Sequence, residues 1–363
     1  MLKSSQSKQI SFKGEKIFIG IDAHLRQWHV SVRTKYVTKA PFSQNPDAAA
    51  LLAYLEREFP EGEYHSAYEA GYCGFHIHRS LVKLGIHNIV FNPADISDTH
   101  KERCRKSDSI DCAKISRNLM NGDLTAIYVP SEQIQADREL LSYRQTKIKS
   151  KTRTKNRVKS LLAKYNIPYP DEFKSRNSHW TKAFRKWLRE LADKSLPPTA
   201  AVVMKGYVDS LDRLQNEVNL INRQINNMLK AHYPEMDLCL RSVPGIGRLC
   251  SAFLCAYIAD INRFETDDKL AGYIGLVPDV RGSDKKQTVL GVTNRGNRLL
   301  RPIIIEAAWM AVRVDPAMTM SYTNYRNRGM QPNNAIIRIA RKLVNRIRYV
   351  LRTGNQYDKS VVK

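Results

Sequence analysis

Hydrophobic and polar residues alternate in the first third of the chain in the manner of short β-strands. Residues 16–34 are predicted to form two strands joined by a polar turn after Asp22, because isoleucines occupy alternate positions before it and the alternation resumes at Trp28. Further segments follow in the order helix, strand, helix, strand: 46–59, 65–69, a helix that ends at Leu84, and 89–92. Strands that alternate with helices in this way predict an α/β domain.

The pattern becomes helical after about residue 137. Between residues 144 and 164 the chain carries nine basic residues and no acid, and it offers few apolar side chains besides Leu161 and Leu162. We expect this helix to lie in solvent or on phosphate. Residues 209–230 then space apolar side chains alternately by three and four: Leu211, Leu214, Val218, Ile221, Ile225 and Met228. This heptad seam predicts either a coiled-coil arm that joins two copies of the chain or a helical hairpin within one copy.

A third region begins near residue 240. The turn VPGIG (243–247) precedes an apolar helix, as in a helix-hairpin-helix, and its glycines would let backbone N–H groups approach a phosphate. A last helix is predicted over about 333–352, in a stretch between Ala317 and Tyr357 that contains no acid. The predicted parts are therefore an α/β domain, a basic helical linker and a mostly helical C-terminal domain: 16–137, 138–235 and 236–355.

The charge balance points to a polyanionic partner. Lys and Arg number 59 and Asp and Glu 35 in a chain of 363 residues, a formal net charge of +24. Such a surplus repels itself unless an anion neutralises it, and nucleic acid is the usual anion. A membrane surface is the competing interpretation. No apolar run approaches the roughly 18 residues of a spanning helix, and the N-terminus lacks the apolar core of a signal peptide, so we expect a cytoplasmic protein.

The cysteines do not form a metal or disulfide pattern. No C-x-x-C pair occurs, and the six cysteines are scattered along the chain: Cys73, Cys104, Cys112, Cys239, Cys250 and Cys255. We therefore expect reduced thiols that act as small buried hydrophobic side chains, and neither zinc nor a disulfide framework.

Four carboxylates stand out by their positions in the predicted elements. Asp22 and Glu69 each end a predicted strand, and Asp108 and Asp111 lie three residues apart, on one face if that segment is helical. Together they could hold two hard cations about 4 Å apart, an arrangement suited to chemistry at phosphorus. Individually each has a plainer interpretation: Asp22 as a turn residue, Glu69 as a surface acid and Asp108 as a helix cap.

These carboxylates lie in motifs that resemble a known family. The N-terminal strings are GIDAH (20–24), YEAGY (68–72), FNP (91–93) and RKSDSIDCAKI (105–115). The C-terminal strings are VPGIG (243–247), DINRFETDDKLAGYIGLVPDVRGSD (260–284) and VTNRGNRLLRPIIIEAA (292–308). In order and spacing they resemble the transposases of the insertion-sequence "one-ten" family, relatives of the Piv DNA invertase, over about residues 16–320.

The resemblance implies a fold and a mechanism. It implies an RNase H-like (RuvC-like) N-terminal domain in which Asp22, Glu69, Asp108 and Asp111 bind Mg²⁺ or Mn²⁺. It also implies that Ser283, in a polar C-terminal loop, attacks a DNA phosphate to form a phosphoserine intermediate. A structured RNA from the element would guide the protein to donor and target DNA. The family usually has glycine after this serine, whereas this chain has Asp284.

The basic side chains supply candidate contacts to DNA or RNA, and the composition does not distinguish the two. The candidates are Lys147, Lys149, Lys151, Arg153, Lys155, Arg157, Lys159, Arg281, Arg295, Arg298 and Arg301. The last three have a spacing of three, so a helix would direct them to one side, toward a scissile phosphate or into solvent. Strand exchange suggests a dimer or tetramer. The alternative function is a RuvC-like junction nuclease, in which metal-activated water attacks and Ser283 has no role.

Overall fold

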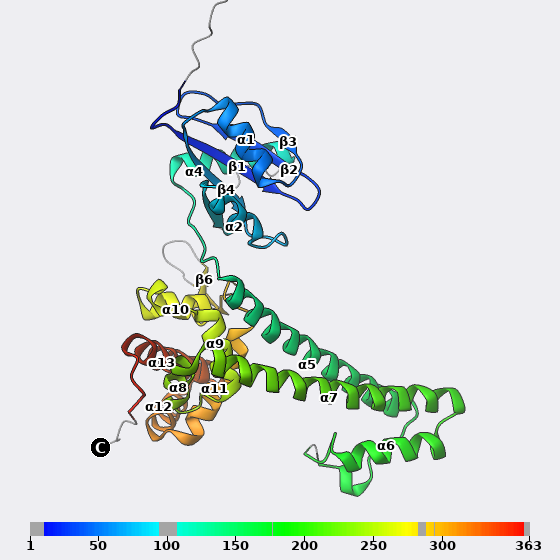
Figure 1. Cartoon of the computed structure of the whole chain (residues 1–363). Helices are drawn as coiled ribbons and strands as arrows, with labels where there is room; N and C mark the ends of the chain where they lie inside the picture. The colour runs from blue at the N-terminus through cyan, green and yellow to red at the C-terminus, as the bar shows by residue number, and fades with distance from the viewer. Residues whose placement is uncertain (1–10, 94–106, 176, 282–287, 294, 359–363) are drawn as a thin grey trace, which may run out of the picture. The chain divides into compact units, whose positions relative to one another are not determined.

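The computed structural model divides the chain into two compact units, residues 1–129 and 130–363 (Figure 1). It describes residues 11–93, 107–175, 177–281, 288–293 and 295–358. The first unit contains a mixed β-sheet with helices, and the second is mostly helical. The predicted combination of an α/β N-terminal part and a helical remainder is therefore confirmed. Within the described residues no helix is both long and apolar enough to cross a membrane.

The first unit is built on a five-stranded sheet in the order β3-β2-β1-β4-β5. Its strands are β1 (Lys16–Ala23), β2 (Trp28–Arg33), β3 (Phe42–Gln44), β4 (Glu63–Glu69) and β5 (His87–Phe91). Strand β2 is antiparallel to both β1 and β3, whereas β4 is parallel to both β1 and β5. The C-terminal ends of β1, β4 and β5 consequently meet at one edge of the sheet.

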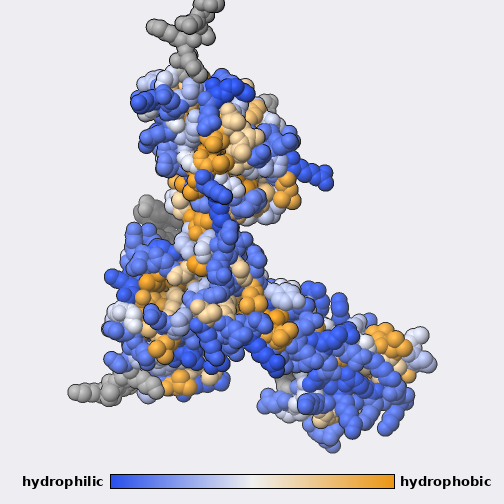
Figure 2. Space-filling view, in the orientation of Figure 1, coloured by the Kyte–Doolittle hydropathy of each residue, from blue (hydrophilic) through white to orange (hydrophobic). Residues whose placement is uncertain are grey.

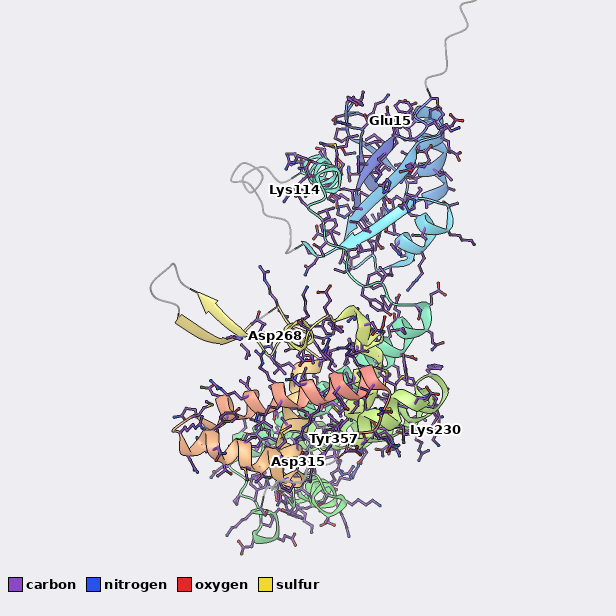
Figure 3. The ribbon with its side chains drawn as sticks, turned by 90° about the vertical axis from the view of Figure 1, so that its left-hand side faces the viewer. Glu15, Lys114, Lys230, Asp268, Asp315 and Tyr357 are labelled. Atoms are coloured by element: carbon purple, nitrogen blue, oxygen red, sulfur yellow. The ribbon has the colours of Figure 1, made fainter. Side chains whose placement is uncertain are left out.

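The two faces of this sheet are covered differently. The isoleucines of β1 point to one face and are fully buried, in a core shared with α1 (Ala48–Glu58) and α2 (His76–Lys83). Helix α4 (Asp108–Asn121) packs on the opposite face (Figure 3). Some of the side chains in contact there are small and polar: Ser31 Oγ lies 3.1 Å from Ser116 Oγ.

In the second unit, α5 (Glu132–Lys164) and α7 (Pro198–His232) form an antiparallel hairpin, with α6 (Lys182–Ser195) packed beside its far end (Figure 1). The buried heptad residues Ile221, Ile225 and Met228 share a core with Leu141 of α5 and with the C-terminal helices. Of the two interpretations of the seam, the structure bears out the intramolecular hairpin.

The remaining elements form a helical core around α9 (Arg248–Ile258), in which every residue from Cys250 to Ile258 is buried. The other elements are α8 (Pro234–Ser242), α10 (Asp267–Ile274), β6 (Pro278–Arg281), β7 (Thr288–Val292), α11 (Leu300–Val314), α12 (Pro316–Asn327) and α13 (Pro332–Thr353). The antiparallel pair β6–β7 was not predicted. Helices α8 and α9 flank the predicted turn.

The two glycines of that turn serve different purposes. Gly245 has a φ of +92°, and a Cβ there would lie 2.5 Å from the carbonyl oxygen of Ala307 in α11. Close helix packing therefore accounts for this glycine. A Cβ on Gly247, at the N-terminus of α9, would meet nothing within 4 Å. Only Gly247 leaves the open backbone that the helix-hairpin-helix interpretation requires.

The cysteines behave as predicted where the structure describes them. Five are free and buried, and Cys104 lies outside the described residues. Burial raises the pKa of the thiols of Cys250 and Cys255 to about 12, so both are neutral thiols at physiological pH.

Candidate functional site

The candidate site begins with Asp22, near the C-terminal end of β1. Side chains two residues apart on a strand share a face, so Asp22 lies on the same face as Gly20. A Cβ on Gly20 would lie 2.1 Å from the carbonyl oxygen of Cys112 and 2.4 Å from the backbone nitrogen of Ser116. The glycine thus lets the backbone of α4 lie directly on β1, on the face to which Asp22 points.

Helix α4 brings the second pair of carboxylates to this face. It begins at Asp108, and both Asp108 and Asp111 lie in its first turn. The N-terminal end of a helix carries unpaired N–H groups and a positive partial charge, which stabilise carboxylates there. The predicted placement of both residues on one helix is confirmed.

Among the residues that the structure describes, Asp22, Asp108 and His24 form a group with metal-ligand chemistry. One ligand atom from each lies within 4.8 Å of the other two. Two carboxylates and an imidazole at this separation can share one divalent cation. The sequence prediction included both aspartates but missed His24, although it stands inside the GIDAH motif.

Each of these aspartates has a histidine neighbour. The Nε2 atom of His24 lies 3.2 Å from Asp22 Oδ2, and the Nε2 atom of His29 lies 3.1 Å from Asp108 Oδ2. Behind them, Tyr72 Oη lies 3.1 Å from His24 Nδ1, and a serine hydroxyl lies 3.0 Å from His29 Nδ1. Each carboxylate is therefore oriented by an imidazole that is itself held by a hydroxyl group.

Strand pairing explains how His29 reaches the site. His29 on β2 is the register partner of Asp22 on β1, so both side chains point toward α4. The sequence did contain a signal for His29. This residue lies two residues before Ser31 on the predicted strand, so both side chains belong to the more polar face of that strand.

The other two predicted carboxylates lie nearby in the fold but outside the three-residue group. Glu69 is the last residue of β4, next to β1, where Tyr68 is the register partner of Ile21. Its side chain is exposed, and that of Asp111 is half-buried. In the described part of the chain, neither supplies an atom to the group within 4.8 Å. The joint role of all four carboxylates stays a prediction.

The thiols beside the site are not candidate ligands. Burial, helped by the charge of Asp22, raises the pKa of Cys112 to about 11, and burial also raises the pKa of Cys73. Neither thiol belongs to the three-residue group among the described residues, so the candidate ligands here are carboxylate oxygen and imidazole nitrogen.

The predicted nucleophile cannot be placed. Ser283 and the following Asp284 lie outside the described residues, between β6 and β7. The side chain of Arg281, at the end of β6, is likewise outside the description. The roles assigned to these residues remain predictions.

The basic tract on α5 has two different sides. Lys147 Nζ lies 2.7 Å from Glu217 of α7, Lys151 donates a hydrogen bond to Gln215, and Lys155 lies 5.1 Å from the ring centre of Trp180. Burial lowers the pKa of Lys151 and Lys155, with neighbouring cations adding to the effect. The candidates that face solvent are Lys149, Arg153, Arg157 and Lys159. The expectation that the tract stays out of packed contacts is therefore wrong for one side.

The expectation that Arg295, Arg298 and Arg301 share a helix face is also wrong. Helix α11 begins only at Leu300, so Arg301 alone lies in it. The side chain of Asn297 explains this start, because its Oδ1 accepts hydrogen bonds from the backbone N–H groups of residues 299 and 300. The guanidinium of Arg301 turns inward and donates a hydrogen bond to the carbonyl oxygen of Thr293.

Comparisons with known proteins agree with this organisation. A family model named for the DEDD transposases of IS110 and described as "Transposase" matches residues 19–167, and the model "Transposase IS116/IS110/IS902 family" matches residues 237–323. The first match begins within β1 and includes the rest of the sheet, α4 and α5, and the second begins within α8 and ends within α12.

Curated proteins give the same result. A putative transposase, y4qE, of Sinorhizobium fredii is 26% identical over 247 residues, 67% of this chain and 57% of the relative. The transposase for insertion sequence element IS1111A of Coxiella burnetii is 26% identical over 66% of this chain and 63% of its own length. A second S. fredii putative transposase, y4rJ, is 26% identical over 81% of this chain and 78% of its own. The chain thus spans less than two thirds of the first two relatives.

Proposed function

We propose that the chain, which contains matches to two transposase family models of the IS110/IS116/IS902 group, cuts and rejoins DNA as the transposase of an insertion sequence. The observation that carries the proposal is the group of Asp22, His24 and Asp108, whose ligand atoms lie within 4.8 Å of one another at the end of β1 and the start of α4. The net charge of +24 supports a nucleic-acid substrate.

The donor atoms of this group fit a divalent cation such as Mg²⁺ or Mn²⁺. Carboxylate oxygens suit both ions, and the two ring nitrogens of His24 face Asp22 and Tyr72, so we assign His24 to orienting Asp22 beside the ion. Asp22 and Asp108 would hold the cation, with Glu69 and Asp111 close by in the fold. When bound, the cation would neutralise charge on the phosphoryl oxygens of the DNA. His24 and His29 keep the two carboxylates oriented toward the shared position.

The proposed nucleophile is Ser283. Its Oγ attacks a DNA phosphorus, so that an Oγ–P bond forms, the bond from phosphorus to the leaving deoxyribose oxygen breaks, and the Oγ proton is passed on to that oxygen. A hydroxyl group of another strand then attacks the phosphoserine, which rejoins DNA and frees the serine. One phosphodiester is exchanged for another, and the reaction needs no external energy source.

We assign an RNase H-like fold to the first unit as part of this proposal. The sheet topology supports this fold. Strands β1 to β3 are antiparallel, β4 and β5 are parallel to β1, and the order is β3-β2-β1-β4-β5. The carboxylates on the α4 face of β1 support it as well.

Guidance by a structured RNA and assembly of two or more copies complete the proposal. Solvent-facing Lys149, Arg153 and Arg157 on α5 fit contacts to a phosphate backbone, which RNA and DNA both offer. Strand exchange between two DNA ends is a natural task for more than one copy.

The test is a cleavage reaction with the purified full chain, element-end DNA, flanking RNA from the element and Mg²⁺. Wild type, Ser283→Ala, Asp22→Ala and the control Ser195→Ala, at an exposed serine of α6, are compared on denaturing gels, with and without protease treatment. We expect a slow, protease-sensitive DNA band for wild type and the control, and its loss in the other two variants.

The same gels separate the alternative. Cleavage without an adduct, lost in Asp22→Ala but unchanged in Ser283→Ala, would contradict the serine mechanism and indicate a hydrolytic junction nuclease. Cleavage that survives Asp22→Ala would contradict the metal site.

A further inference from the structure

A groove of about 630 Å³ lies in the second unit, between the β6–β7 pair and helices α12 and α13. We infer that this groove binds unpaired nucleotides of a single-stranded nucleic acid. Its volume is within the ~300–1,000 Å³ of ordinary ligand sites. Figure 3 shows the β6–β7 pair beside α13, with Asp268 of α10 nearby. None of the candidate contacts predicted from the sequence lines it.

The groove has cations that are available to phosphate. Arg338 and Lys342 lie one turn apart on α13 and are exposed. Among the described residues neither forms an ion pair, whereas Arg341, between them, is paired with Asp268. The sequence contains no acid from Ala317 to Tyr357. Two solvated cations at this spacing can contact the phosphate backbone of one strand.

The groove also has a surface for bases. Tyr325 of α12 is half-buried, and both Arg338 and Lys342 lie over its ring, with the guanidinium carbon 5.6 Å and the ammonium nitrogen 5.8 Å from the ring centre. Val292 and Ile337, which are both half-buried, add apolar surface. Aromatic rings beside cations are the usual means of binding unstacked bases, since every base has a flat face.

This combination favours single strands over a duplex. A duplex presents phosphates and keeps its base faces stacked, so a tyrosine and apolar side chains would gain little from it. An unpaired strand offers phosphates and base faces together. The amide side chain of Asn345, exposed at the groove, can donate to and accept from base edges. The inference rests on the proposed function, because strand exchange and a guide RNA both supply unpaired nucleotides.

The experiment measures binding by the full chain to fluorescein-labelled oligothymidylate, oligouridylate and a duplex of the same length, over a range of salt concentrations. Arg338→Gln/Lys342→Gln and Tyr325→Leu are compared with wild type. Arg313→Gln/Arg328→Gln removes the same charge from exposed positions outside the groove. Equal thermal unfolding midpoints show that the variants are folded.

For the double variant in the groove we expect roughly tenfold weaker binding of single strands and a salt slope reduced by about 1.4, since each phosphate contact contributes about 0.7. Tyr325→Leu should weaken single-strand binding without changing the slope. The affinity of both groove variants for the duplex should stay within about twofold of the wild-type value. The control double variant should match wild type in its affinity for every probe. The single-stranded probe that loses more affinity identifies DNA or RNA as the natural occupant.

A direct contact is tested by ultraviolet cross-linking of a 5-iodouridine strand, which should attach to the peptide that contains Tyr325. The groove assignment would be overturned if the double variant bound single strands as tightly as wild type does. It would also be overturned if the double variant lost as much affinity for the duplex as for single strands. If the chain still forms the DNA adduct in that case, the groove alone is wrong. Failure to bind any nucleic acid would contradict the groove and the proposed function together.

Discussion

Gly20 lies where α4 crosses β1, and the backbone of α4 occupies the space that any side chain would need. The contact fixes the height of α4 above the sheet and thereby the position of Asp108 relative to Asp22. A residue without a side chain thus determines the geometry of the two candidate ligands.

We predict that Gly20→Ala lowers the stability of the first unit by about 1–3 kcal/mol, because the added methyl group meets backbone atoms that have no room to move. Divalent-cation affinity should fall as well, because α4 must shift. Gly206→Ala, in open space on α7, should instead stabilise the chain by about 0.5–1 kcal/mol. Thermal unfolding of the three proteins checks this, and an unchanged midpoint for Gly20→Ala would count against close packing of α4.

The two histidines give a second prediction at this scale. His24→Gln and His29→Gln should each raise the Mn²⁺ concentration needed for half-maximal DNA cleavage by roughly 10–100-fold, because each removes the group that orients a carboxylate. His76→Gln, exposed on α2, is the matched control. If the cation requirement is the same in all variants, the histidines do not position the site.

The sequence alone predicts the aspartates but not their histidine neighbours. Strand ends and helix starts can be recognised from local patterns, which suffices for Asp22 and Asp108. The distance between His29 and Asp108 depends on the pairing register of β1 with β2 and on how closely α4 packs against Gly20. Neither the register nor this packing distance can be predicted from local hydrophobic periodicity.

At the scale of elements, the α5 helix combines a packed side with a solvated one. Its length and basic character follow from the sequence, but which lysines face α7 depends on how the hairpin closes. Figure 2 shows a largely hydrophilic surface over the arm formed by α5, α6 and α7. Exposed Lys149, Arg153 and Arg157 lie four residues apart and form one stripe.

We predict that replacing this stripe, in Lys149→Gln/Arg153→Gln/Arg157→Gln, lowers the salt slope of duplex binding by up to about 2.7, at about 0.9 per phosphate contact. The triple variant of Lys147, Lys151 and Lys155 to Gln removes the same charge from the packed side. It should change the slope less and the unfolding midpoint more. Equal slopes in the two triple variants would mean that the stripe is not the contact surface.

The heptad seam gives a prediction about assembly. Ile225→Ala should cost about 2–5 kcal/mol of stability, because its side chain is buried in the core of one chain. The oligomeric state, measured by sedimentation on the folded variant, should not change. Leu220→Ala, exposed on the same helix, should leave stability unaffected. Dissociation of an otherwise folded Ile225→Ala protein would show that the seam joins two copies.

The β6–β7 pair and the start of α11 could not be predicted from the sequence. The strands are short and flank a polar segment, and the start of α11 at Leu300 depends on the cap that Asn297 forms. A spacing of three among arginines gives no information about where a helix begins. The long helical segments within α7 and α13, by contrast, could be predicted from the sequence.

At the scale of the whole molecule, many cations of this chain are already engaged. Arg346 pairs with the buried Asp315, and Arg348 Nη1 lies 2.9 Å from Asp267. These pairs fasten α13 to α10 and to the start of α12. The net charge of +24 therefore overstates the number of cations that are open to a nucleic acid, and we propose that the α5 stripe and the groove supply them.

The central claim is that Asp22 and Asp108 share one divalent cation. The measurement that tests it most directly is Mn²⁺ binding to the full chain without DNA, followed by electron paramagnetic resonance. Wild type is compared with Asp22→Asn, Asp108→Asn and the control Asp123→Asn, which removes an exposed acid of the same unit. We predict saturable binding in wild type and the control, and at least roughly tenfold weaker binding in the other two. Equal affinity in all four proteins would contradict a shared metal site.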